Sequence, residues 1–371
     1  MKNTVINFKI TTLSPVCILD EDGKKLSPYI DIIKDKDSII ELDKEKIINS
    51  IINDNRSFNM YLNILKNKSP NSIDKFTMQK LIEDKGLKIE NITYRKIKCK
   101  SSINNLIEVH SCMKSNGKAY IPGSSLKGAI RTAILFNNSN EEQILERIDY
   151  LEDLKPKIKC STIKKSYVGE DVFRSKPNDI QSDKFKYLIV RDSERVKSNL
   201  VIYEARSINI FKNKNKSEIP LDMRMLLECI DIGEELNFQI VIKDEYFEKE
   251  KIFNYINEFY EKVIAREIEE VSRIYDVESK NKLINEYSLL LEKIRLLKRE
   301  NSGFILRVGR LKGYFSNSIT SQCKSETLSR ITNIYKVKKR KKINEFPTTK
   351  WVVTNNENID GLFGWVQVKE V

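Results

Sequence analysis

The sequence has no long apolar run, only one histidine and few cysteines. No stretch approaches the roughly 18 apolar residues that a membrane-spanning helix requires. The first residues, MKNTVINFKITTL, alternate polar and apolar side chains and lack the apolar segment of a signal peptide. We therefore expect a cytoplasmic protein that makes no membrane contact.

The cysteines are too widely spaced for the common metal sites. None of the six falls in a C-x-x-C or similar spacing: Cys17, Cys99, Cys112, Cys160, Cys229 and Cys323. We expect no metal site, no disulfide framework and no cofactor. The single histidine, His110, lies in an apparent strand. RNA cleavage commonly uses histidine because its pKa lies near neutrality, but one histidine in a strand favours a structural or RNA-contacting role.

The balance of charge is basic. The chain has 66 Lys and Arg against 53 Asp and Glu, a formal net charge of +13. Such an excess attracts polyanions, and nucleic acid is the leading partner. The sequence is also crowded with Lys, Asn and Ile, the signature of an AT-rich genome, which raises the lysine content without any binding role. A scaffold whose charge reflects codon usage therefore stays open.

The spacing of apolar residues predicts a mixed α+β fold. Strand-like runs occur at residues 2–13, 91–98, 105–112, 185–190, 200–211, 221–230, 235–242 and 365–371. Helical spacing predicts an insertion at about 43–84 and two long helices within 246–300. Strands and helices follow in mixed order without strict βαβ alternation, which favours α+β. A length of 371 residues suggests two domains.

One glycine-containing segment, IPGSSLKGAIR at residues 121–131, predicts an anion site. Pro122 and Gly123 favour a tight turn, and Ser124 or Ser125 is a suitable helix cap. The free N–H groups of the first helical turn, at the positive end of the helix dipole, bind anions.

Three further residues of this segment bear on phosphate binding. Lys127 and Arg131 are four apart and share one face of the helix, from which they can supply charge to phosphates. Gly128 lets another backbone approach closely. The order of a Walker loop is absent. A capped helix whose glycines serve only packing is the alternative.

The string IPGSSLKGAIRTAIL resembles the signature helix of the RAMP superfamily, RNA-binding proteins that build CRISPR effector complexes. Other segments resemble the family in the same order along the chain: residues 13–15, 188–192, 227–234 and the glycine-rich loop 309–314. The resemblance implies ferredoxin-like (RRM-like) folds, and the length suits two of them. The first would occupy residues 1–195 with the helical insertion, and the second residues 196–371 with the long helices.

Within the superfamily, the chain is most similar to the Csm-type subunit of type III-A effectors that lies at the 3′ end of the guide RNA. The pointers are residues 20–31, the helical insertion, and residues 347–351 and 364–365. The resemblance implies a non-catalytic crRNA-binding subunit of a ribonucleoprotein in antiviral defence, which caps the guide and supports its maturation and target RNA binding. Implied partners are the 3′ region of crRNA, target RNA, the backbone RAMP subunit, the small helical subunit and host guide-trimming nucleases.

The two glycine-rich anion sites and their flanking cations predict one continuous RNA-binding surface, lined by Ser124, Ser125, Lys127, Arg131, Arg310 and Lys312. The expected RNA-binding set is Gly123, Ser124, Ser125, Lys127, Gly128, Arg131, Arg191, Gly309, Arg310, Lys312 and Gly313. The basic run 336–342 is expected to be a secondary contact with RNA or a partner. Backbone subunits of these complexes cut RNA with an Asp after the first strand, and Asp31 is displaced from that place. A guide-processing RAMP endoribonuclease and a type III-B counterpart are the alternative functions.

Overall fold

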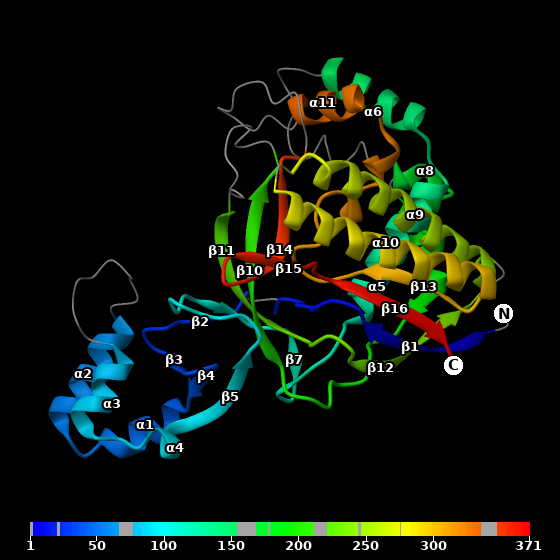
Figure 1. The fold of residues 1–371 in the computed structure, drawn as a ribbon. Coiled ribbons are helices and arrows are strands. Elements are labelled where there is room, and N and C mark those ends of the chain that lie inside the picture. Colours follow the sequence, from blue (N-terminus) through cyan, green and yellow to red (C-terminus); the bar gives the residue numbers. More distant parts are fainter. Residues whose placement is uncertain are drawn as a thin grey trace.

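The structure, a computed structural model, confirms the mixed α+β class (Figure 1). It describes residues 3–20, 23–66, 77–153, 168–176, 179–210, 221–243, 246–274, 276–334 and 347–371. Two sheets contain most of the strands, and a layer of long helices covers one of them.

Strand β1 (Thr4–Thr12) lies at the centre of a five-stranded antiparallel sheet. Its exposed and buried residues alternate, so that Ile6, Phe8 and Ile10 face the core. The strands are ordered β13 (Gly303–Arg307), β16 (Trp365–Glu370), β1, β12 (Glu235–Ile242) and β9 (Leu188–Val190). This sheet therefore joins the beginning, the middle and the end of the chain.

Three helices pack on the buried face of this sheet: α5 (Gly123–Asn137), α9 (Lys249–Val271) and α10 (Val277–Glu300). The two long helices fall inside residues 246–300, as the apolar spacing predicts. Phe253, Ile256 and Tyr260 of α9 are all buried, and Phe8 of β1 lies 5.8 Å from Phe253 between ring centroids. The apolar stripe of each helix thus closes the core over the sheet.

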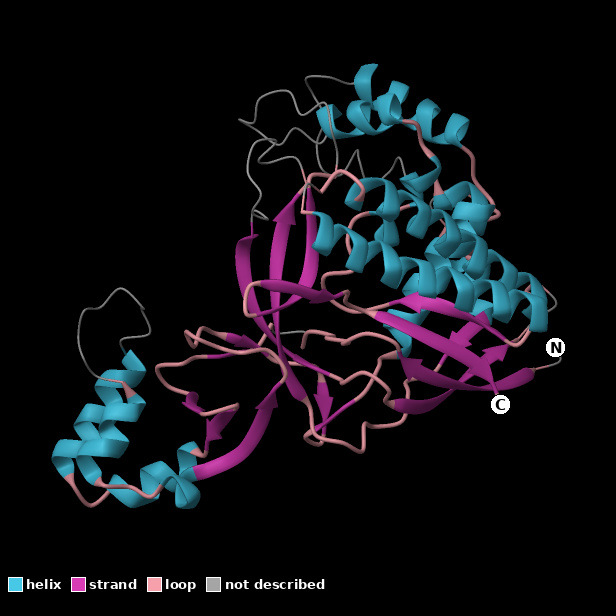
Figure 2. Cartoon of the chain, viewed as in Figure 1, coloured by secondary structure: helices cyan, strands magenta, loops and turns pink. Residues whose placement is uncertain are grey.

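The second sheet is larger and curls between the helical layer and the N-terminal helices (Figure 2). Its path is β2 (Lys25–Leu26), β6 (Val109–His110), β11 (Leu221–Cys229), β10 (Val201–Asn209), β5 (Thr93–Cys99), β4 (Ser38–Leu42) and β3 (Ile32–Asp35). On β10 it also carries β14 (Thr349–Asn355), which pairs with β15 (Asn358–Gly361). A separate hairpin joins β7 (Lys114–Ser115) to β8 (Lys118–Ala119).

The predicted helical insertion has its own small core. It contains α1 (Lys44–Ile51), α2 (Asn55–Lys66), α3 (Met78–Lys85) and α4 (Ile89–Ile92), and lies at the lower left of Figure 1. Side chains such as Ile47, Tyr61 and Leu81 pack with Ile33 and Ile40 of the adjoining strands in a cluster separate from the main core. The insertion extends to residue 92, beyond the predicted limit at 84.

Strands from both sides of residue 195 join each sheet. The boundary predicted there does not coincide with a boundary between the sheets, and the division into two domains stays a prediction. The remaining helices are α6 (Glu141–Asp153), α8 (Gly169–Phe173), α11 (Ser325–Ile334) and four short 3-10 turns at Ile180–Ser182, Lys184–Tyr187, Phe315–Asn317 and Ile319–Gln322. Across the described ranges, no helix combines the length and apolar character needed to cross a membrane.

A buried carboxylate connects the two sheets. Glu267 of α9, only 3% exposed, accepts a hydrogen bond from the Tyr287 hydroxyl of α10 at 2.6 Å. It also pairs with Arg307 of β13 at 3.5 Å and with the ammonium of Lys350 on β14. Burial raises the pKa of Glu267, but the charges of Lys350 and then Arg307 outweigh burial and hold the pKa below its ordinary value.

We expect Lys350→Met to lower the free energy of unfolding by about 3–5 kcal/mol, because it leaves a buried carboxylate without its nearest cation. Lys282→Met removes the exposed pair with Asp360 and should cost less than about 1 kcal/mol. Urea unfolding followed by circular dichroism measures both. An equal decrease in the free energy of unfolding in the two variants would show that the buried pair stabilises the protein no more than the exposed pair.

Candidate nucleic-acid interface

Helix α5 begins differently from the sequence prediction. Its N-cap residue is Pro122, and neither Ser124 nor Ser125 caps it. Instead, the Gly123 N–H donates a hydrogen bond to the Asp192 carboxylate at 2.7 Å. The predicted serine cap is wrong because β9 ends beside the helix and brings in a charged acceptor, which binds an N–H more strongly than a hydroxyl. The chain thus supplies one anion of its own to this helix N-terminus.

The two glycines of the segment have different surroundings. A Cβ on Gly123 would lie 2.2 Å from the Val190 carbonyl oxygen, so this glycine permits close packing of α5 on β9. A Cβ on Gly128 would meet nothing within 4 Å, and Gly128 is exposed. The close approach of another backbone, predicted at Gly128, occurs within the protein at Gly123 instead. The space over Gly128 is open to a backbone from outside the described residues.

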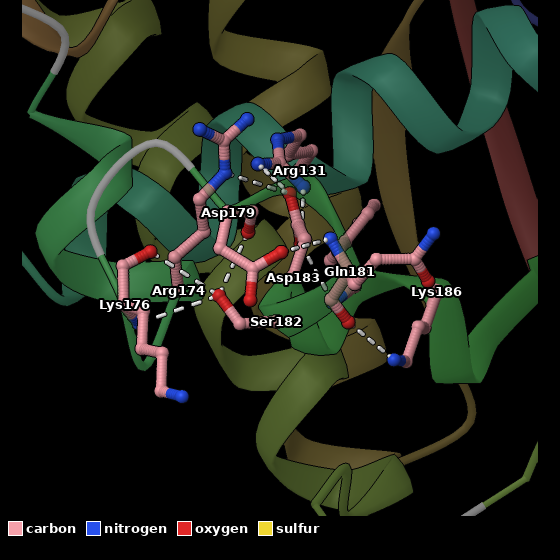
Figure 3. A network of polar contacts seen from close by, with 9 residues as sticks. Arg131, Arg174, Lys176, Asp179, Gln181, Ser182, Asp183 and Lys186 are labelled. Atoms are coloured by element: carbon pink, nitrogen blue, oxygen red, sulfur yellow. Dashed lines mark hydrogen bonds and ion pairs between the residues drawn. The ribbon is translucent and has the colours of Figure 1, made fainter.

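Lys127 and Arg131 share one face of α5, as their spacing predicts (Figure 3 shows the surroundings of Arg131). The Arg131 guanidinium pairs with both oxygens of Asp183, at 2.9 and 3.3 Å, and lies 4.0 Å from the ring centre of Phe173. Lys127 Nζ lies 5.1 Å from the ring centre of Phe185, and burial together with Arg131 lowers its pKa. Arg131 is therefore held in place by an internal carboxylate.

Arg191 follows β9 on the exposed side of the five-stranded sheet. Its guanidinium donates to the Gln239 side chain at 2.7 Å, and Gln239 in turn donates to Asn7 at 2.9 Å. This row of polar side chains runs across the sheet, from the end of β9 over β12 to β1. The arginine is exposed and stays oriented along the sheet edge near the start of α5.

The second glycine-rich loop follows β13. Gly309 has a φ of +80°, and a Cβ there would lie 2.4 Å from the Cys17 carbonyl oxygen. The same oxygen accepts a 2.7 Å hydrogen bond from the Arg310 N–H, while the Arg310 side chain is exposed. The loop therefore needs glycine at 309 and presents an arginine to solvent beside the loop after β1.

Two more residues of this loop lie over the buried cluster. Gly313 has a φ of +76°, and a Cβ there would lie 3.3 Å from a Glu267 carboxylate oxygen. Burial, and then the charge of Arg307, lowers the pKa of Lys312. Lys312 is therefore a half-buried cation whose charge is stabilised by any anion that binds nearby.

His110 and Asp31, the two residues considered for catalysis, have different surroundings. His110 lies on β6, where burial, followed by Lys25 and Arg310, lowers its pKa. Asp31 pairs with Lys44 at 2.5 Å and accepts the Ser27 N–H at 2.8 Å, which fixes a turn. Among the residues that the structure describes, no three His, Cys, Asp or Glu side chains gather as a metal site would require.

Sequence reasoning assigned no role to two carboxylates of the site, Asp192 and Asp183. Asp192 had a signal, because it closes the segment 188–192 that resembles the family pattern. Asp183 had none, since its pairing with Arg131 spans 52 residues. The basic run 336–342 lies outside the described residues. One continuous surface joining the two glycine-rich loops stays a prediction.

A model of the RAMP superfamily matches residues 113–316, more than half of the 371-residue chain. The chain belongs to the RAMP superfamily. The matched span includes helix α5 and the loop at 309–314, together with residues 188–192 and 227–234, and leaves out only residues 13–15 of the segments that carried the resemblance. The expectation from the sequence is confirmed.

A curated relative of this RAMP chain is "CRISPR system Cms protein Csm5" of Methanocaldococcus jannaschii, 27% identical over 284 residues. The alignment covers 71% of this chain and 60% of the relative, so the chain spans less than two thirds of that protein's length.

Two solved structures have the same fold at 23% identity. One chain belongs to "Cryo-EM structure of Csm-crRNA-target RNA ternary complex in type III-A CRISPR-Cas system", with a TM-score of 0.69 and coverage of 99% of this chain and 100% of that one. The other is "Crystal structure of T.onnurineus Csm5", with a TM-score of 0.62 and coverage of 97% and 99%.

The two glycines of α5 allow a matched test. Gly123→Ala should lower the free energy of unfolding by about 1–3 kcal/mol, because the new methyl overlaps the Val190 carbonyl. Gly128→Ala should be neutral or stabilising by up to about 1 kcal/mol, because alanine suits an open helical position. Chemical unfolding compares the two, and a destabilised Gly128→Ala would contradict the open space.

Proposed function

We propose that this RAMP chain is a non-catalytic crRNA-binding subunit of a type III-A Csm effector complex. The observation that carries the proposal is the RAMP match across α5 and the loop after β13. Similarity to Csm5 and to a chain solved within a Csm–crRNA–target RNA complex supports the assignment to a Csm effector. In this role the chain caps the 3′ region of the guide and supports guide maturation and target RNA binding.

The first sheet supports the proposed ferredoxin-like fold. In chain order its strands β1, β9, β12 and β13 alternate with helices as β1–α5–β9–β12–α9/α10–β13. Their spatial order is that of a ferredoxin-like sheet, with β16 inserted between β13 and β1. We propose a second such fold for the strands of the curled sheet, in line with the two-fold arrangement expected from chain length.

Within the predicted RNA-binding set, phosphate recognition is assigned to the cations that have no carboxylate of the described residues at bonding distance: Lys127, Arg191, Arg310 and Lys312. Gly123 and Gly313 shape the loops, and the open space at Gly128, flanked by Ser124 and Ser125, admits a phosphate backbone. Arg131 contributes mainly by holding the surrounding side chains in position, because Asp183 already neutralises its charge. Such contacts hold a strand without reading its sequence.

The proposed chemistry is binding alone. Cleavage at a 2′-hydroxyl needs an acid and a base near one phosphate. His110 is the only histidine of the sequence, and the Asp31 carboxylate already pairs with Lys44 and accepts the Ser27 N–H. The proposed partners are crRNA, target RNA, the backbone RAMP subunit, the small helical subunit and guide-trimming nucleases. A purified chain that cleaves RNA and loses that activity on His110→Ala would make it an endoribonuclease instead.

Replacing Lys127 and Arg310 with alanine should flatten the salt dependence of RNA binding. Two lost phosphate contacts on single-stranded RNA reduce the slope of log K against log salt by about 1.4. Fluorescence anisotropy of a labelled guide RNA, titrated across NaCl concentrations, measures the slope. Arg131→Ala should change the slope less than Lys127→Ala, because Asp183 already pairs with Arg131.

Lys282→Ala is the control, because Lys282 is an exposed lysine of α10 that belongs to neither glycine-rich loop and already pairs with Asp360. Its slope should equal that of the wild type. If the Lys127 and Arg310 double variant keeps the wild-type slope, the proposed RNA contacts are wrong.

A further inference from the structure

A cavity of about 200 Å³ opens beside the C-terminal half of α5 and the start of α9. Four aromatic side chains line it: Phe173, Tyr246, Phe247 and Tyr255. This space suits a single planar ring system and is too small for a drug-sized ligand.

Tyr246 is the most exposed of the four aromatic walls, at 57% of its surface. It stacks on Tyr187 with ring centres 5.7 Å apart and planes 10° from parallel. Large aromatic side chains at the surface of a protein that also carries a positive charge are typical of sites where bases stack. The exposed part of the Tyr246 ring is therefore available as a stacking platform for a base from outside the protein.

Lysines surround this platform. Lys184 Nζ lies 4.8 Å from the ring centre of Tyr246, and Lys186 Nζ lies 5.1 Å from that of Tyr187. Lys251, on the first turn of α9, lies 5.8 Å from the ring centre of Tyr255. None of the three pairs with a carboxylate in the described part of the chain at salt-bridge distance. Their charges are available to the phosphates of a strand that crosses the rim.

One aromatic side chain, Phe185, connects the walls of the cavity to the cations of the signature helix. Phe185 contacts Phe173 and Phe247, two walls of the cavity, at ring distances of 5.3 and 5.8 Å. Lys127 and Arg131 both lie over the opposite part of this cluster, against Phe185. Lys127 and the cavity therefore contact the same buried ring, so that they lie close enough to contact one strand.

We propose that this cavity takes one unstacked base of single-stranded RNA, with the neighbouring phosphates at Lys184, Lys186 and Lys251. The inference rests on the proposed RNA-binding function and adds a base-stacking contact to it. Glu248 also lines the cavity, so the interior disfavours a phosphate, while its carboxylate can accept a hydrogen bond from a base N–H group, such as the ring N–H of uracil. Three rim lysines complement phosphates on either side of the base, which favours RNA over a neutral apolar peptide.

The test compares two labelled oligomers of about ten units, one of uridine and one of the same length built from abasic ribose phosphates. Fluorescence anisotropy at one salt concentration gives the affinity of each. The wild type should bind the uridine oligomer more tightly. Tyr246→Ala should lower affinity for it by about 5- to 150-fold and leave the abasic affinity almost unchanged. Tyr246→Phe should keep the difference between the oligomers.

Tyr94→Ala is the matched control, since Tyr94 is a similarly exposed tyrosine on β5, at 62%. It should behave as the wild type. Equal wild-type affinity for both oligomers, or a difference that persists in Tyr246→Ala, overturns the base site and leaves phosphate binding standing. If the wild type binds neither oligomer, both the proposed function and this inference are wrong. If Tyr246→Ala keeps RNA affinity but loses another effector subunit on co-purification, the cavity is a protein-docking site and the inference is wrong.

Discussion

The arrangement of both sheets depends on the carboxylate of Glu267. It lies on α9 and binds, at once, the Tyr287 hydroxyl of α10, Arg307 of the five-stranded sheet and Lys350 of the curled sheet. Isolated, any of these buried charges would cost several kcal/mol, so the cluster is stable only when all its elements are in place. One carboxylate thereby fixes the relative positions of the helical layer and the two sheets.

The same cluster supports the loop after β13. Arg307 is the last residue of that strand, and its Nε donates to the Phe363 carbonyl at 3.0 Å. Gly313 closes over the Glu267 carboxylate, so a side chain at this place would press against the charge. The exposed Arg310 lies between these anchored points, with its N–H bound to the loop after β1. A rigid scaffold thus presents a cation on a loop, the usual division between stability and binding.

Local sequence predicted those features that depend on nearby residues. The apolar spacing placed α9, α10 and the helical insertion, and alternation placed β1, β10, β11 and β12, because each element must bury one regular face. Pairing between distant segments was beyond such reasoning. The cap of α5 comes from Asp192, 69 residues away, and the insertion of β16 beside β1 joins the two ends of the chain. Such contacts follow from the fold and not from local propensity.

In the proposed RNA-binding role, two internal carboxylates limit what the signature helix offers to a strand. Asp192 already occupies the Gly123 N–H, and Asp183 already neutralises Arg131, so these two groups are ordered before any ligand arrives. Because these groups are ordered in advance, less entropy is lost when a ligand binds. The same pairing leaves less positive charge on α5 to attract a phosphate. Under the proposal, attraction for RNA falls to Lys127 and to cations on other elements. The helix would then serve first as a fixed frame, on which the open space at Gly128 and the aromatic cluster of Phe185 would set where a strand lies.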